Sequence, residues 1–230
     1  MKSNNFTFLE EKKQKKLIRN FPKYLYAIES SLIDQFGKEK ASEIMTQAWL
    51  AYPDILPLTP CFETPMYDAL MVQAGKMAAL KKGMKMAGIS TEQFVRFNIE
   101  QTRSKAGRIP SWVKRVGGRL YLSGFMRRYL KKVGRSVSSH GWPTEVIDGT
   151  PQDDFEMSVE TRECQMVRFW ESIGEGDIKP YCTFFDFTAA ESLGVGLKQV
   201  STIDSGVCKY CFYRNGGVEW PERIREIMAD

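Results

Sequence analysis

Histidine is almost absent from this sequence, and long apolar runs are absent altogether. The chain of 230 residues has a single histidine, His140, which excludes metal sites built on several histidines. The most apolar helical window, residues 67–89, is interrupted by Gln73, Lys76, Lys81, Lys82 and Lys85. Charged side chains are costly at the centre of a bilayer, so we expect no membrane-spanning helix and no membrane partner.

An apolar export segment is also missing. Residues 1–20 are polar and Lys-rich, unlike a secretory signal, so we expect a cytoplasmic protein. The five cysteines are an odd number, which is typical of reduced thiols in a reducing compartment. Each thiol is therefore a candidate for core packing, metal ligation or reaction.

The charge imbalance is small, with 33 Lys and Arg residues against 28 Asp and Glu, a net charge of +5. Solubility explains this excess, and we expect no nucleic-acid partner. A basic run lies at helical spacing near aromatic residues, as in some nucleic-acid binders, but we interpret it as the solvated face of an amphipathic helix. Its members are Lys114, Arg115, Arg119, Arg127, Arg128, Lys131, Lys132 and Arg135.

Helical periodicity dominates the first half of the chain. Apolar residues recur at helical spacing over residues 8–51, where Pro22 is expected to break or begin a helix and Gly37 to end one, and again over residues 66–88. A capping-box pattern, Ser90-Thr91-Glu92-Gln93, opens the next helix. A further helix after Pro110 is expected to turn its apolar side chains toward the core: Trp112, Val113, Val116, Leu120, Leu122, Phe125 and Leu130.

The period changes after Ser136. Residues 144–148 and 155–161 alternate as half-buried strands do, and residues 196–203 and 207–214 predict a strand pair joined at residues 204–206. We therefore predict an α+β fold, with a helical N-terminal half followed by a small antiparallel sheet with short helices. The length fits a single domain, residues 1–230, made of a helical subregion (1–137) and an α+β, cysteine-containing subregion (138–230).

Cys208 and Cys211 have the two-residue spacing of zinc knuckles and redox motifs, and Cys164 and Cys182 could complete a four-thiolate set. Residues three apart on a straight strand point to opposite faces, however, and Lys209-Tyr210 lacks turn chemistry. We therefore favour buried thiols and expect no metal and no cofactor. The alternative is a non-enzymatic small-molecule or metal-binding module that uses these C-terminal cysteines.

Cys182 and Asp186 have a spacing that would place them on one face of a helix. If the helix begins between them, its positive end would lower the pKa of the thiol and favour the nucleophilic thiolate. The other interpretation is that Asp186 caps the helix and Cys182 belongs to the core. His140, in the loop-like sequence Ser138-Ser139-His140-Gly141, is the histidine that a cysteine–histidine pair would have to use, unless it is a solvated loop side chain.

A sparse motif in the last third of the chain resembles the C-terminal signature of the L-2-amino-thiazoline-4-carboxylic acid hydrolase family. The motif is Cys182-x-x-x-Asp186-Phe187, Leu193-Gly194, Leu197, Thr202-x-x-x-Gly206 and Cys211-x-Tyr213-Arg214. Similarity extends over about residues 140–215, and Cys164 looks like the earlier cysteine of that family. Phe212 stands where the family usually has an acidic residue, and Cys208 is additional.

The resemblance implies hydrolysis of a cyclic amidine-type ring in a small carboxylate substrate. Water or a thiolate would add to the carbon between sulfur and nitrogen and open a C–N or C–S bond. Cys182 or Cys211 would be the nucleophile and Asp186 an acid–base or orienting group. Cys164, His140 and Thr202 are expected to contact the substrate. The expected partner is a small molecule, and the sequence does not specify an oligomeric state.

Overall fold

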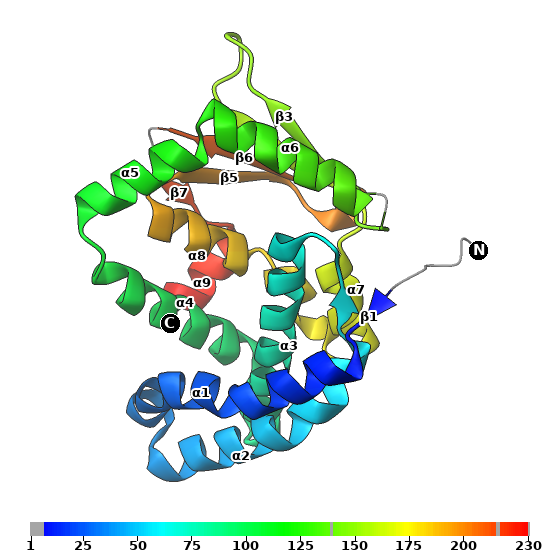
Figure 1. The fold of residues 1–230 in the computed structure, drawn as a ribbon. Helices are drawn as coiled ribbons and strands as arrows, with labels where there is room; N and C mark the ends of the chain where they lie inside the picture. The colour runs from blue at the N-terminus through cyan, green and yellow to red at the C-terminus, as the bar shows by residue number, and fades with distance from the viewer. Residues whose placement is uncertain (1–6, 139, 215–216, 230) are drawn as a thin grey trace. The chain divides into compact units, whose positions relative to one another are not determined.

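The computed structural model of the protein describes residues 7–138, 140–214 and 217–229. The predicted α+β class is confirmed, because a helical first half precedes a small, mostly antiparallel sheet (Figure 1). The chain divides into two compact units: Met1–Gln101 with Gln165–Pro180, and Thr102–Cys164 with Tyr181–Asp230. These boundaries differ from the expected subregions, since a segment of the second half joins the first unit.

The first unit is built mainly from helices. They are α1 (Glu11–Phe36), α2 (Lys38–Ile55), α3 (Pro65–Met86), the start of α4 (Thr91–Gly107) and α7 (Gln165–Ser172), with the short helices η1 (Leu56–Leu58) and η2 (Gly176–Tyr181) and a two-stranded ribbon of β1 (Thr7–Phe8) and β2 (Pro60–Cys61). Gly37 separates α1 from α2, as predicted. Pro22, however, lies inside α1, where buried Phe21 and Leu25 continue one apolar face across it.

The predicted capping box at the start of α4 is present in full. The Ser90 hydroxyl accepts a hydrogen bond from the Gln93 backbone N–H (3.2 Å), and the Gln93 side chain accepts one from the Ser90 N–H (2.9 Å). Two N–H groups that the helix itself cannot satisfy therefore have acceptors, which explains why α4 begins where it does.

A buried ion cluster ties α3 to the segment around η2 within the first unit. The Lys81 side chain is 2% exposed, and its ammonium donates to Glu175 (2.5 Å) and Asp177 (2.7 Å). The Thr91 hydroxyl also donates to Asp177. Burial of an ammonium is costly unless the charge is paired and hydrogen-bonded, and two carboxylates meet that requirement here.

The second unit is built around a five-stranded sheet. Its strands are β3 (Thr144–Asp148), β4 (Met157–Thr161), β5 (Gly196–Ser201), β6 (Cys208–Tyr213) and β7 (Val218–Glu219), in the order β3-β4-β6-β5-β7. The β5–β7 pair is parallel and the other pairs are antiparallel. The helices are α5 (Ser111–Tyr121), α6 (Gly124–Ser138), α8 (Phe184–Leu193) and α9 (Glu222–Ala229), with η3 (Ile203–Ser205) in the β5–β6 connection. No helix in the described ranges combines the length and the apolarity needed to cross a membrane.

Both α6 and α8 lie on one face of this sheet. The register aligns Thr144 with Thr161 and Thr161 with Cys208, so these side chains share a face with Tyr210. Gly134 of α6 lies against Thr144, and Phe187 of α8 contacts the Tyr210 ring at 6.3 Å between ring centroids. α6 packs against β3 and α8 against β5, and Figure 1 shows both helices beside the sheet.

The expectation for the helix after Pro110 was wrong in two respects. The segment forms two helices, α5 and α6, and most of the apolar side chains expected in the core are exposed, with only Leu122 and Leu130 buried. At Gly118 a side-chain carbon would lie 2.9 Å from the Leu193 carbonyl oxygen, closer than real contacts allow. The glycine face of α5 therefore packs against α8, and its apolar face is turned to solvent.

Replacing Lys81 with Met should destabilise the protein by about 3 kcal/mol, because Glu175 would stay buried with only the exposed and more distant Lys85 ammonium, at 3.6 Å, as a counterion. The matched control is Lys15→Met, which breaks an exposed pair with Glu11 (side chains 74% and 79% exposed) and should cost less than about 0.5 kcal/mol. Urea unfolding of both variants measures the difference. Equal losses would contradict a structural role for the buried cluster.

Candidate functional site

Five side chains with titratable groups gather on the helix-covered face of the sheet in the second unit. We call this set the thiol–carboxyl cluster: Cys164, Cys182, Asp186, Cys208 and Tyr210. Cys164 follows β4, Cys182 lies two residues before α8, and Asp186 lies in the first turn of α8. Cys208 and Tyr210 alternate along β6 and therefore share one face. The structure thus brings together three of the thiols and the carboxylate singled out in the sequence.

A relay of polar side chains runs through this cluster. The Tyr210 hydroxyl interacts with both the Asp186 carboxyl and the Cys208 thiol and lowers the pKa of each group. The Gln199 amide donates to the Cys208 sulfur at 3.6 Å. The hydroxyl can donate to the carboxylate while its oxygen accepts from the thiol, so every donor in the relay has an acceptor.

Asp186 has a carboxyl that ionises close to neutral pH. Burial raises its pKa from 3.8 to about 6, although the hydrogen bond from Tyr210 acts in the opposite direction. The side chain is nevertheless accessible to solvent. Both properties fit a carboxyl that packs against protein on one side and is reached by water on the other. A group in this position can exchange protons with a bound molecule.

The pKa values of the thiols move in the opposite direction from the one expected at a helix N-terminus. α8 does begin between Cys182 and Asp186, as the spacing required. Burial nevertheless raises the pKa of Cys182 well above its usual value, and Cys164, Cys208 and Asp186 raise it further. Burial also raises the pKa of Cys208. The prediction of a thiolate activated by the helix end is therefore wrong, because desolvation and neighbouring acids outweigh the helix dipole.

Cys211 lies outside the cluster. It is three residues from Cys208 on β6, and Ser158 and Lys198 are its partners in the register. Burial raises its pKa, while Lys209 lowers it and the acidic residues Asp154 and Glu160 raise it. These neighbours differ from those of Cys208, as expected for the opposite face of a strand. The structure therefore separates Cys211 from Cys182 and Asp186.

The other two expected substrate contacts are exposed. His140 follows α6, and its Nδ1 lies 2.8 Å from the Ser136 carbonyl oxygen. Its position fits the interpretation of a solvated loop side chain better than a cysteine–histidine pair. Thr202 precedes η3, whose Asp204 contributes to the raised pKa of Cys182. Thr202 thus lies two residues from a group that acts on the cluster.

A cavity of about 540 Å³ adjoins the relay at Gln199. It is lined by Lys198, Gln199, Val218, Glu219, Trp220, Pro221 and Arg225. Trp220 is 9% exposed, and its indole N–H has no hydrogen-bond partner among the described residues. The Arg225 guanidinium makes the cavity suitable for a ligand with acceptor oxygens.

The sequence interpretation missed Tyr210, Gln199 and Trp220. Tyr210 could have been found, because the alternation of the predicted strand puts it on the same face as Cys208. Gln199 and Trp220 carry no comparable signal, since an isolated amide and an indole are common in any fold. Their roles follow from the pairing of β5 with β6 and from the contact of Trp220 with Phe187 (5.4 Å between ring centroids).

The three clustered thiols do not form a metal site. Over residues 7–138, 140–214 and 217–229, no group of three or more His, Cys, Asp or Glu side chains is arranged to hold a metal ion. The four-thiolate set that a metal-binding module would need is not assembled either, because Cys211 lies on the other face of β6.

Asp186→Asn should change how stability depends on pH. The folded pKa of about 6 exceeds the usual 3.8, so the folded state binds more protons between these values, and stability falls as pH rises from about 4 to 6. The shift corresponds to about 3 kcal/mol for a fully desolvated group, and solvent access should reduce the effect to about 1 kcal/mol. Asparagine does not titrate and should abolish this fall. Urea unfolding at about pH 4 and about pH 6 measures this fall in stability. The control is Asp34→Asn, which replaces an exposed aspartate. The same pH dependence in Asp186→Asn and Asp34→Asn would contradict the assignment.

Comparison with known proteins adds no relative to these observations. A scan against protein families, a search of curated proteins and a search of solved structures each find no match to this chain. The resemblance to the L-2-amino-thiazoline-4-carboxylic acid hydrolase family therefore stays a prediction from the sequence. The case for a function rests on the geometry of the thiol–carboxyl cluster and of the cavity beside it.

Proposed function

We propose that this protein is a hydrolase that opens a cyclic amidine-type ring in a small carboxylate substrate. The observation that carries the proposal is the relay from Asp186 through Tyr210 and Cys208 to Gln199 at the cavity wall. A carboxyl with a pKa of about 6 can accept a proton and return it near neutral pH, which acid–base catalysis requires. The resemblance to the thiazoline hydrolase family supports the same class of reaction.

The cavity supplies what such a substrate needs for binding. Its volume of about 540 Å³ lies in the range of small-molecule sites. The Arg225 guanidinium could donate to a substrate carboxylate. The other cation on the wall, Lys198, is engaged by Glu219 at 2.9 Å, so Arg225 is the better candidate for this role.

The proposed reaction uses water as the nucleophile. Water adds to the ring carbon between sulfur and nitrogen, forming a C–O bond, and its proton passes through the Cys208 thiol and the Tyr210 hydroxyl to Asp186. The Gln199 amide only orients the thiol. The C–S bond then breaks, and the leaving sulfur takes a proton from the relay, which gives an N-carbamoyl product with a free thiol. We favour water over Cys182 because burial keeps that thiol protonated.

Asp186→Asn should lower kcat/KM for 2-amino-thiazoline-4-carboxylate about 100-fold, because the relay loses its proton acceptor. In the wild-type protein, kcat/KM should fall as pH drops through about 6, where Asp186 becomes protonated. Product formation is followed by mass spectrometry, which avoids interference from the protein thiols.

Two cysteine variants on β6 provide the matched comparison. Cys208→Ser removes a thiol of the relay and should reduce turnover, whereas Cys211→Ser alters a buried thiol on the opposite face and should leave turnover unchanged. Turnover that survives Asp186→Asn and Cys208→Ser but not Cys211→Ser would overturn the assignment of the relay. Binding of the thiazoline without any turnover by the wild-type protein would favour the non-enzymatic small-molecule module instead.

A further inference from the structure

The helix α5 presents an apolar stripe to solvent. Trp112, Val116 and Leu120 follow one another at a spacing of four residues and are 66%, 48% and 61% exposed. Val113, 37% exposed, lies beside them. We call these four residues the α5 stripe. Residues four apart share one side of a helix, so the four side chains form one continuous surface.

The opposite side of α5 explains why the stripe cannot face inward. Gly118 is buried, and a side-chain carbon there would lie 2.9 Å from the Leu193 carbonyl oxygen and 3.3 Å from that of Gly194. Only a glycine side of α5 fits against the end of α8 at this distance. A surface helix ordinarily turns its apolar side toward the core, and the reversed arrangement is typical of a surface that binds another structure.

The stripe lies within the most basic segment of the chain. Residues 101–144 contain 11 Lys and Arg residues and no Asp or Glu. The rest of the chain therefore carries 22 basic and 28 acidic residues, a net charge of −6. Charge of one sign is thus concentrated around the exposed apolar side chains, and a partner for this surface should be anionic.

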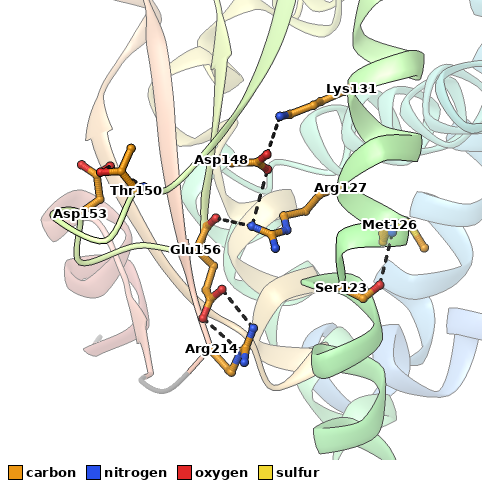
Figure 2. Close-up of polar contacts among 9 residues, drawn as sticks. All are labelled: Ser123, Met126, Arg127, Lys131, Asp148, Thr150, Asp153, Glu156 and Arg214. Carbon is orange, nitrogen blue, oxygen red and sulfur yellow. Dashed lines mark hydrogen bonds and ion pairs between the residues drawn. The ribbon is translucent and has the colours of Figure 1, made fainter.

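Some of these basic side chains form ion pairs within the second unit, and others are exposed to solvent. Figure 2 shows Arg127 and Lys131 of α6 reaching Asp148, at 3.6 Å and 2.6 Å. Arg115 and Arg119, by contrast, are exposed and lie three residues after Trp112 and Val116, directly beside the α5 stripe. At the start of α6, Phe125 is 80% exposed and adds a further aromatic ring.

The partner must therefore be apolar and anionic at the same time. A two-fold pairing of two copies through this surface would bring like charge against like charge. A nucleic acid is anionic, but it offers phosphates and sugars rather than an apolar layer to Val113, Val116 and Leu120. The surface of a bilayer with anionic headgroups provides both properties, because acyl chains lie directly beneath the charge.

We propose that the α5 stripe and its flanking arginines dock on the surface of a membrane that contains anionic lipids. The stripe would lie in the interface, with Trp112 and Leu120 among the first acyl carbons and Arg115 and Arg119 at the headgroups. α5 has 11 residues and contributes four apolar side chains, so the association is reversible and sensitive to salt. This surface attachment is independent of the proposed hydrolase activity and requires no helix that crosses the bilayer.

Vesicle sedimentation with the full chain tests the proposal. The vesicles are phosphatidylcholine alone or phosphatidylcholine with about one-third phosphatidylserine, in about 0.1 M salt. Binding is expected to the anionic vesicles alone and should weaken as salt increases. Leu120→Asn should reduce the partition coefficient roughly tenfold, because one apolar side chain no longer enters the interface.

Leu50→Asn is the matched control, since Leu50 lies on α2 and is also 61% exposed. It should leave binding unchanged, and thermal unfolding of both variants verifies that they fold. Arg115→Gln combined with Arg119→Gln should lower the partition coefficient roughly tenfold or more. Any of three outcomes would overturn the proposal: no binding to anionic vesicles, an equal effect of Leu50→Asn and Leu120→Asn, or binding to an oligonucleotide but not to vesicles.

Discussion

One face of the sheet accommodates several groups that all become negative when they ionise, and this constraint governs the chemistry of the second unit. The neighbours that raise the pKa of Cys182 are Cys164, Cys208 and two aspartates, so loss of a proton from any one of them opposes loss from the others. Burial acts in the same direction. The thiols of Cys182 and Cys208 are therefore held protonated near neutral pH, and Asp186, with its pKa of about 6, ionises before them.

This order of ionisation favours a relay of protons over an attack by a thiolate. A single hydroxyl, that of Tyr210, separates the one group that ionises easily from the thiol that contacts Gln199 at the cavity. The arrangement depends on strand alternation, which puts Cys208 and Tyr210 on the same side of β6, and on α8, which begins just before Asp186. A shift of one residue in the register of β6 would turn both side chains to the other face and break the relay.

Much of the fold could be predicted from local chemistry. The capping box at Ser90 and Gln93 and the strand pair at the end of the chain depend on neighbouring residues, and both are present. The orientation of α5 could not be predicted in the same way. Periodicity shows that Trp112, Val116 and Leu120 share a side of a helix, but it does not show which side packs inward. That depends on the approach of Leu193 to Gly118, a contact between residues far apart in the sequence.

The sequence predicted which types of residue form the candidate site, but it did not identify each individual residue. The Cys182–Asp186 pair follows from spacing alone, whereas the choice between Cys208 and Cys211 required the register of β6. A motif match selected Cys211, and strand alternation selects Cys208, because only the latter shares a face with Tyr210. A signature in sequence therefore locates a region, and side-chain direction then decides which of its residues can act together.

α8 connects the two surfaces for which a role is proposed. Asp186 lies in its first turn, and its last residue and the following glycine meet the glycine face of α5. Ten residues of helix span roughly 15 Å, so Asp186 and the α5 contact lie near opposite ends of one rigid element. The α5 stripe points away from α8, which means that changes at Leu120 need not disturb Asp186. A side chain at Gly118 would press on the Leu193 carbonyl, so the packing beneath the α5 stripe and the position of α8, which carries Asp186, depend on the same contact.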